Sequence, residues 1–142
     1  HSVAMAWWPS PCNGRAQKTE HPPLLGLHRM GEVPKLLSAP QKDQRRLKGY
    51  AGSVAISVEN NAVAITSPRG GITQVFGQES GLLEAQYEAP DVCGLGAADN
   101  GFLFTTGTGE IGWASGQQTS ILANSGMSWD NHLVSMHQGV GL

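Results

Sequence analysis

The chain repeats a short pattern of residues after about 39 positions. Ala64–Ile72 contains an apolar pair, a hydroxyl pair, a glycine turn and an apolar residue, and Leu103–Ile111 has the same order. Upstream, Asp91–Leu95 has a counterpart at the same spacing in Asp130–Val134. Repeats of roughly 40 residues that combine short strands with glycine turns are typical of β-propeller blades. The repeat therefore predicts an all-β fold of WD40-like blades.

Composition narrows the classes of partner. Only 14% of the 142 residues are charged and the net charge is -2, so the chain offers no basic surface for nucleic acid. Its 19 glycines and 8 prolines are typical of a turn-rich all-β protein. No apolar run approaches the roughly 18 residues that a membrane span needs. We therefore expect no nucleic-acid partner and no membrane span.

The strand pattern predicts how the blades divide the chain. We expect a single all-β region, a β-propeller fragment of about three four-stranded antiparallel blades. Residues 1–49 form a partial first blade and a connector, residues 50–89 and 90–126 form two complete blades, and residues 127–142 form a closing strand and a tail. The chain thus begins inside a blade, as expected of a fragment or a processed product.

The partial blades at the two ends complement each other. Residues 2–8, 24–28 and 35–37 supply the last three strands of one blade, and Asp130–Met136 supplies the first strand of another. Three blades are too few to close a ring, since known rings have about four to eight. We therefore predict self-association, most simply a symmetric dimer in which each Asp130–Met136 strand completes the first blade of the partner.

Gln41–Lys48 is the main run of charge in the chain. It is long enough for one helical turn, but its polarity favours a solvated connector between two blades. It is short for a phosphate-binding patch.

Four stretches resemble one known family: residues 22–40 (PPLLGLHRMGEVPKLLSAP), 49–76 (GYAGSVAISVENNAVAITSPRGGITQVF), 91–111 (DVCGLGAADNGFLFTTGTGEI) and 129–136 (WDNHLVSM). They are similar, in the same order, to the C-terminal part of the bacterial family called domain of unknown function 1513. The resemblance implies a propeller-like fold. It also implies a periplasmic location, because members usually carry an export signal, although no signal peptide is present in this chain.

The resemblance does not supply an activity, since the family has none established. Some members are encoded near imelysin-like iron-uptake proteins. This context implies an accessory role in iron uptake or in periplasmic redox chemistry.

The innermost strand of each propeller blade lines the central channel, where ligands usually bind. Three pairs of residues occupy equivalent positions at the start of successive blades and are expected near one axis. They are Tyr50 and Ser53, Asp91 and Cys93, and Asp130 and His132.

Carboxylate, thiolate and neutral imidazole are all competent metal donors, so Asp130, His132 and Cys93 are candidate ligands of a divalent metal. The same residues suit acid–base chemistry. Structural roles remain open for each: Asp91 and Asp130 as turn caps, Cys93 as a small buried residue, and His132 as a donor to a backbone carbonyl. A disulfide between Cys93 and Cys12, or two free thiols, also remain open.

Arg69 lies in the turn Ser67–Gly71, where glycines allow the backbone to approach a ligand. Arginine binds carboxylate or phosphate groups bidentately. The equivalent turn of the next repeat has Thr108, so the repeat itself does not require arginine there. The structural alternative is a salt bridge between blades, for example with Asp91.

Three functions follow from these residues. The first is a module that binds a protein or small-molecule ligand, or a scaffold, with Arg69, Asp91, Asp130 and His132 at the channel mouth. The second is a metal-assisted hydrolase or lactonase-like enzyme centred on Asp130, His132 and Arg69. The third is the accessory role in iron uptake or redox chemistry that the resemblance implies.

Overall fold

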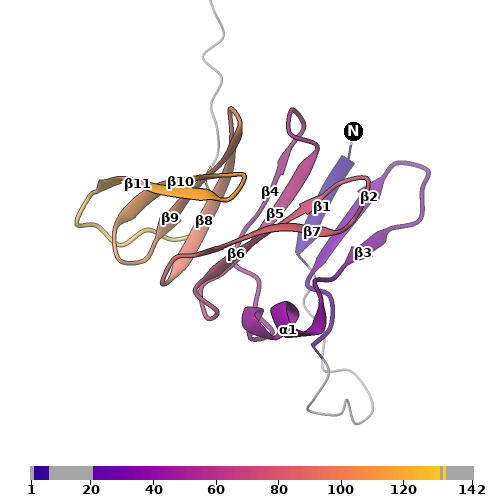
Figure 1. The fold of residues 1–142 in the computed structure, drawn as a ribbon, viewed down its shortest axis with the longest axis horizontal. Helices are drawn as coiled ribbons and strands as arrows, with labels where there is room; N and C mark the ends of the chain where they lie inside the picture. The colour runs from indigo at the N-terminus through magenta and orange to yellow at the C-terminus, as the bar shows by residue number, and fades with distance from the viewer. Residues whose placement is uncertain (1, 7–20, 132, 134–142) are drawn as a thin grey trace, which may run out of the picture.

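The computed structural model describes residues 2–6, 21–131 and 133. In this part of the chain, three antiparallel sheets lie side by side (Figure 1). The first sheet has the order β1–β2–β3, with β1 (Ser2–Ala6), β2 (Leu25–Arg29) and β3 (Lys35–Leu37).

The second and third sheets each have four strands in an up-and-down order. The strands of the second sheet are β4 (Val54–Ser57), β5 (Ala62–Ser67), β6 (Ile72–Gly77) and β7 (Leu83–Glu88). Those of the third sheet are β8 (Val92–Ala98), β9 (Gly101–Thr106), β10 (Glu110–Ser115) and β11 (Gln118–Asn124). The all-β prediction is therefore confirmed, and the arrangement is blade-like, as in a fragment of a β-propeller.

The charged run joins the first two sheets, as expected of a connector, and it forms the helical turn that its length allowed. It forms α1 (Gln41–Gln44) and the 3₁₀ turn η1 (Arg45–Leu47). Gln44 and Leu47 are three positions apart and both are buried, while the charged residues between them are more exposed. Burial of this face stabilises a helix that the charges alone would leave solvated. No helix in the described part of the chain is long and apolar enough to cross a membrane.

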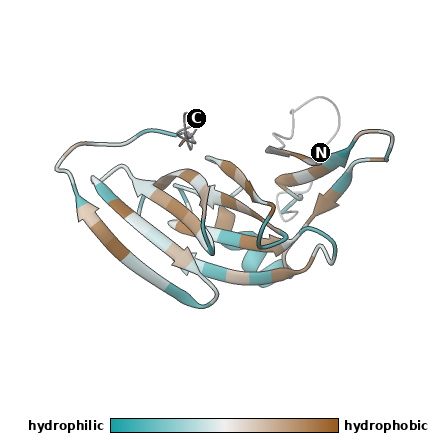
Figure 2. Ribbon diagram, turned by 90° about the horizontal axis from the view of Figure 1, so that it is seen from above, coloured by the Kyte–Doolittle hydropathy of each residue, from teal (hydrophilic) through white to brown (hydrophobic). Residues whose placement is uncertain are grey.

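The middle sheet packs on both of its neighbours. Val63 and Ile65 point from β5 into a core shared with the first sheet and η1, whereas Ala62 and Ala64 point into a core shared with the third sheet. Successive side chains of a strand face opposite sides, so one strand serves both cores. Brown apolar and teal polar segments accordingly follow one another along several strands (Figure 2).

The turns gather at two opposite ends of the sheets. We call one the helix end, because α1 and η1 lie there beside the β5–β6 turn: Ser67 Oγ donates to Leu47 O at 2.7 Å. The other end carries the β2–β3, β4–β5 and β6–β7 turns. There Lys35 Nζ donates to Glu79 O at 3.0 Å, and Gln78 N donates to Asn61 O at 2.9 Å.

These contacts fix the direction of the strands in the first sheet. β2 runs away from the helix end, as β4 and β6 do, and β1 runs toward it, as β5 and β7 do. β1 also packs beside β4, at the inner side of the stack. The three strands therefore correspond to β5, β6 and β7, and the first sheet lacks a counterpart of β4 within the described chain. This agrees with the predicted partial blade that contains the last three strands.

Two predicted strands reach beyond the described residues. The first was expected over residues 2–8, and the structure has a strand over Ser2–Ala6. Of the expected closing strand, Asp130, Asn131 and Leu133 are described, and they do not form a strand. The remainder of both segments lies outside the described residues.

Thr66 links the second and third sheets through one buried hydroxyl. Its Oγ1 donates to Cys93 O at 2.8 Å and accepts from Ser53 N at 2.8 Å, and the side chain is fully buried. A buried backbone group that loses its partner costs more free energy than the bond itself contributes. This hydroxyl therefore holds the inner strands in register.

We expect Thr66→Val, which preserves shape and removes the hydroxyl, to lower the free energy of unfolding by about 1–3 kcal/mol, measured by denaturant titration. The matched control is Thr119→Val on the exposed strand β11, where the change should stay within about 0.5 kcal/mol. Equal effects of the two substitutions would contradict the bridging role.

Candidate functional site

The turn that carries Arg69 is held rigidly at the helix end. Gly70 N donates to Ser67 Oγ at 3.1 Å, Gly71 N donates to Ser67 O at 2.8 Å, and Gly71 has a φ of +64°. Gly70 packs so closely on the carbonyl of Arg46 that a side chain there would clash. The glycines are therefore required by the turn and its packing on η1, and they leave Arg69 as the side chain that projects from the turn.

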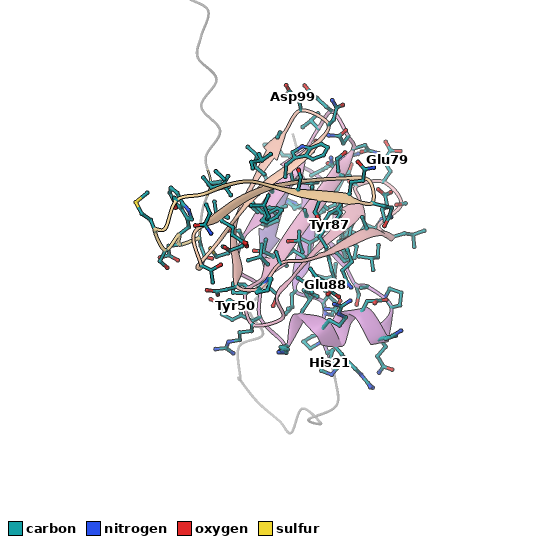
Figure 3. The ribbon with its side chains drawn as sticks, turned by 60° about the vertical axis from the view of Figure 1, so that its left-hand side comes forward. His21, Tyr50, Glu79, Tyr87, Glu88 and Asp99 are labelled. Carbon is teal, nitrogen blue, oxygen red and sulfur yellow. The ribbon has the colours of Figure 1, made fainter. Side chains whose placement is uncertain are left out.

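Arg69 is exposed and stacks on an aromatic ring. Its Cζ lies 4.7 Å from the centroid of Tyr50, which is half-buried. This is a cation–π geometry, and it restricts the rotamers of the guanidinium without using its N–H groups. Figure 3 shows Tyr50 near the helix, at the opposite end of the molecule from Asp99 and Glu79.

Asp91 shapes a turn, which is the structural role that the sequence left open for it. Val92 N donates to Ala89 O at 3.2 Å across Pro90 and Asp91, and Asp91 has a φ of +54°. Proline followed by a left-handed residue is the pattern of a type II turn, in which Asp is one of the few tolerated side chains. Its exposed carboxylate lies against Gly107, where no side chain would fit.

The structure brings Arg69 and Asp91 to adjacent turns at the helix end. Ala89 N donates to Gly71 O at 3.0 Å, and the Cα of Pro90 lies 3.6 Å from where a Cβ of Gly71 would be. The two side chains do not form the predicted salt bridge, although both are described. The ion pair at this end joins Arg46 and Glu88 instead.

The buried thiol of Cys93 already contacts two backbone carbonyl oxygens. Its Sγ lies 3.2 Å from Trp129 O and 3.5 Å from Thr105 O, and it takes part in no disulfide. A metal bound at this sulfur would have to displace these contacts from a closed interior. The geometry therefore favours the alternative in which Cys93 packs as a small apolar residue.

The segment that carries Asp130 lies beside Cys93 at the helix end. Trp129 Nε1 donates to Gly109 O at 3.3 Å, which anchors the segment to the β9–β10 turn. Asp130 is exposed, and its Oδ1 accepts from Asn131 N at 2.7 Å. Asp130 therefore shares the helix end with Arg69 and Asp91.

Ser53 and His132 are the two remaining members of the predicted channel group. Ser53 is almost fully buried, and its backbone N–H is bound to Thr66. His132 lies outside the described residues. Among the residues that are described, no three His, Cys, Asp or Glu side chains converge on a point that could hold a metal ion. The metal site of Asp130, His132 and Cys93 stays a prediction.

Sequence reasoning missed two cavities at the end opposite the helix. One, of about 280 Å³, lies between the β2–β3 and β6–β7 turns and is lined by His28, Arg29, Lys35 and Glu79 among others. The other, of about 210 Å³, lies between the second and third sheets, with Tyr87 and Phe102 in its walls. Both depend on contacts between separate repeats, so no local pattern could have signalled them.

Tyr87, in the wall of the second cavity, has a shifted pKa. Its hydroxyl donates to Gly116 O at 2.7 Å and so ties β7 to the β10–β11 turn. Burial disfavours the charged phenolate and raises the pKa of Tyr87 above its ordinary value of 10.0.

The fold and the helix end described above define an all-β protein of blade-like sheets, with connecting turns gathered at the ends of the sheets. The chain belongs to the family described as "Protein of unknown function (DUF1513)", whose model matches residues 9–136. This confirms the family resemblance, and it supplies no activity. No curated protein matches the chain.

One similar solved structure is the crystal structure of the computationally designed Ika8 protein, crystal packing No.1 in P63. The two chains share 17% sequence identity with a TM-score of 0.49. The alignment covers 70% of this chain and 30% of that chain, so this chain spans less than a third of the length of that structure.

The raised pKa of Tyr87 predicts a loss of stability in alkali. Below the unfolded pKa the neutral phenol contributes fully to stability, and this contribution is lost as the pH rises from about 10 through the folded pKa. The chain has two tyrosines, so Tyr50→Phe leaves Tyr87 as the sole reporter. Its tyrosinate absorbance should titrate with a midpoint above 10.0 in the native protein, and a midpoint at or below that value would contradict the burial effect.

Proposed function

We propose that this protein is a periplasmic β-propeller module that binds a protein or small-molecule ligand at the helix end. The supporting observation is Arg69, an exposed guanidinium that is oriented over Tyr50 and forms no ion pair with the neighbouring Asp91. An exposed guanidinium that is held over an aromatic ring suits a carboxylate or phosphate group of a ligand.

The carboxylates beside Arg69 narrow the kind of ligand. Asp91 lies on the adjacent turn, and Asp130 is exposed at the same end of the sheets. The helix end thus carries charges of both signs. It is complementary to a ligand that has an anionic group and a cationic group, as peptides and amino acids do. A purely anionic ligand would meet the arginine but also the two carboxylates.

The periplasmic location and the propeller architecture rest on the family. The periplasmic location is the one that the family resemblance implies, and the three stacked sheets are the arrangement expected of propeller blades. We also propose that the protein self-associates to complete the ring. The support is that, within the described residues, the first sheet has three strands where the other two have four.

The contribution of Arg69 is tested with ligands that carry one anionic and one cationic group. We expect wild-type protein to bind glycine or glycylglycine in a calorimetric titration, and Arg69→Gln to weaken the tighter of the two by about 10- to 100-fold. This range corresponds to roughly 1.5–3 kcal/mol for hydrogen bonds to a charged group.

Arg45→Gln is the matched control, because Arg45 is also exposed at the helix end, on η1. It should leave the affinity unchanged. Absence of binding by the wild-type protein, or equal loss in both variants, would overturn the assignment of Arg69.

A further inference from the structure

The cavity between the second and third sheets is bounded by the two four-stranded sheets. Its volume is about 210 Å³, and all of its lining residues fall within residues 60–117. Six of these side chains are at least nine-tenths buried: Ala62, Val75, Ala85, Tyr87, Phe102 and Ala114. Three of the six are alanines, whose small side chains leave the space between the sheets open.

Two hydrogen bonds hold the walls of this cavity together. The hydroxyl of Tyr87 donates to Gly116 O at 2.7 Å, and Gln117 Nε2 donates to Glu84 O at 3.3 Å. Both bonds join β7 to the β10–β11 turn, so they connect one sheet to the other. The cavity is therefore largely preformed, as ligand sites usually are.

The cavity between the first and second sheets occupies the equivalent place one repeat earlier. Gln78 in its lining and Gln117 in the lining of the second cavity are 39 positions apart, and each follows the third strand of its sheet. The first cavity is lined by three basic side chains, those of His28, Arg29 and Lys35, whereas the described lining of the second has none. The stacking of the sheets thus creates the space, and the local residues decide its chemistry.

Charge is distributed unevenly along the chain, and the second cavity lies in the acidic part. All nine Lys and Arg residues precede Gly70, whereas seven of the eleven Asp and Glu residues follow it. Asn100 in the lining is preceded by the exposed Asp99, and Asn60 is preceded by the exposed Glu59. Figure 3 shows Asp99 at this end of the molecule. The resulting potential favours a cationic over an anionic ligand.

One carboxylate belongs to the cavity lining itself. The register between β6 and β7 shifts after Val75, so that Glu84 is the extra residue of a β-bulge. Bulges re-aim a side chain relative to the alternation of the strand. The carboxylate of Glu84 covers Gly77, which is the cross-strand partner of Ala62 in the cavity wall. It forms no ion pair with a described residue and is therefore open to a cation from solution.

The volume and the walls of the cavity limit the size and shape of the ligand. A cavity of about 150 Å³ holds one benzene molecule, whereas drug-sized ligands occupy pockets of about 300 Å³ or more. A volume of about 210 Å³ thus suits one ring with a short chain. The rings of Tyr87 and Phe102 in the walls favour an aromatic ligand, and aromatic faces also attract a cation.

From these observations we infer that the cavity binds a small arylalkylammonium ion, with its ring between the two sheets and its ammonium group beside Glu84. Amide oxygens at the rim are further acceptors for an ammonium group, and they belong to Asn60, Asn100 and Gln117. The site lies at the end of the sheets opposite Arg69, so it is separate from the binding proposed for the helix end.

The first test compares three probes of similar size in calorimetric titrations of the full chain. 2-Phenylethylamine is a cation at neutral pH, 2-phenylethanol is uncharged and phenylacetate is an anion. We expect the amine to bind about 3- to 10-fold more tightly than the alcohol, as one solvated charge pair allows, and phenylacetate to bind most weakly. A wild-type protein that does not bind the amine, or that binds phenylacetate equally well, would overturn the inference.

The second test locates the site with substitutions. Glu84→Gln preserves shape and removes the charge, so it should weaken the amine about 3- to 10-fold and leave the alcohol within about 2-fold. Ala85→Val adds two methyl groups to the cavity wall, where there is room for them, and should weaken both ligands. Because Glu84 is exposed, Glu84→Gln decides the assignment even if Ala85→Val does not fold.

Glu79→Gln is the matched control, because Glu79 is also exposed at this end but lines the first cavity. It should leave the affinity for the amine unchanged. Equal losses in Glu84→Gln and Glu79→Gln, or wild-type affinities in a folded Ala85→Val protein, would contradict binding in the second cavity. Amine binding that is lost in Asp130→Asn but not in Glu84→Gln would place the amine at the helix end instead.

Discussion

The burial of β5 on both faces is the constraint on which the rest of the structure depends. Val63 and Ile65 on one side and Ala62 and Ala64 on the other are nearly inaccessible to water, so the first and third sheets are each packed against this strand. A sheet covered on both faces is a core element even when all of its strands are antiparallel. The hydroxyl of Thr66, at the end of the same strand, then fixes the third sheet through Cys93 O.

The same stacking creates the helix end. The turns after β5, β7 and β9 lie at one end because these strands run in one direction within two stacked sheets. η1 closes against this end through Leu47, whose carbonyl accepts from Ser67. Arg69 is positioned indirectly by this contact, since Gly70 packs on the carbonyl of Arg46 and the arginine has to project outward over Tyr50. Long-range packing thus converts a flexible surface arginine into an oriented group.

The propeller-like stacking also explains why both ends of the assembly are apolar. Each sheet has two faces, and a linear stack leaves one face of its first and last sheets uncovered. Leu103 and Trp113 at one end and Val3 and Leu36 at the other are the residues left in this position.

The sequence could predict the strands, but it could not predict the surroundings of every side chain. The strands of the second and third sheets follow from alternating apolar residues and glycine turns, which are local signals. The sequence left the helical form of the charged run 41–48 open, because this form depends on burial of Gln44 and Leu47 against strands that are distant in the sequence. The repeat placed Cys93 at a channel position, but its thiol contacts Trp129 and Thr105 in the interior, an orientation that repeat spacing does not encode.

The sequence by itself therefore determined the all-β class, the family and the succession of up-and-down strands, because strand periodicity, turn residues and repeat length are properties of neighbouring residues. Only the tertiary structure decided which side chains share a surface. Arg69 meets Tyr50, Asp91 packs on Gly107, and Leu133 packs on the glycines of β8 through contacts that span up to 39 positions of the chain. Such contacts are set by the stacking of whole sheets, in which the burial of many distant apolar side chains outweighs the preference of any single residue.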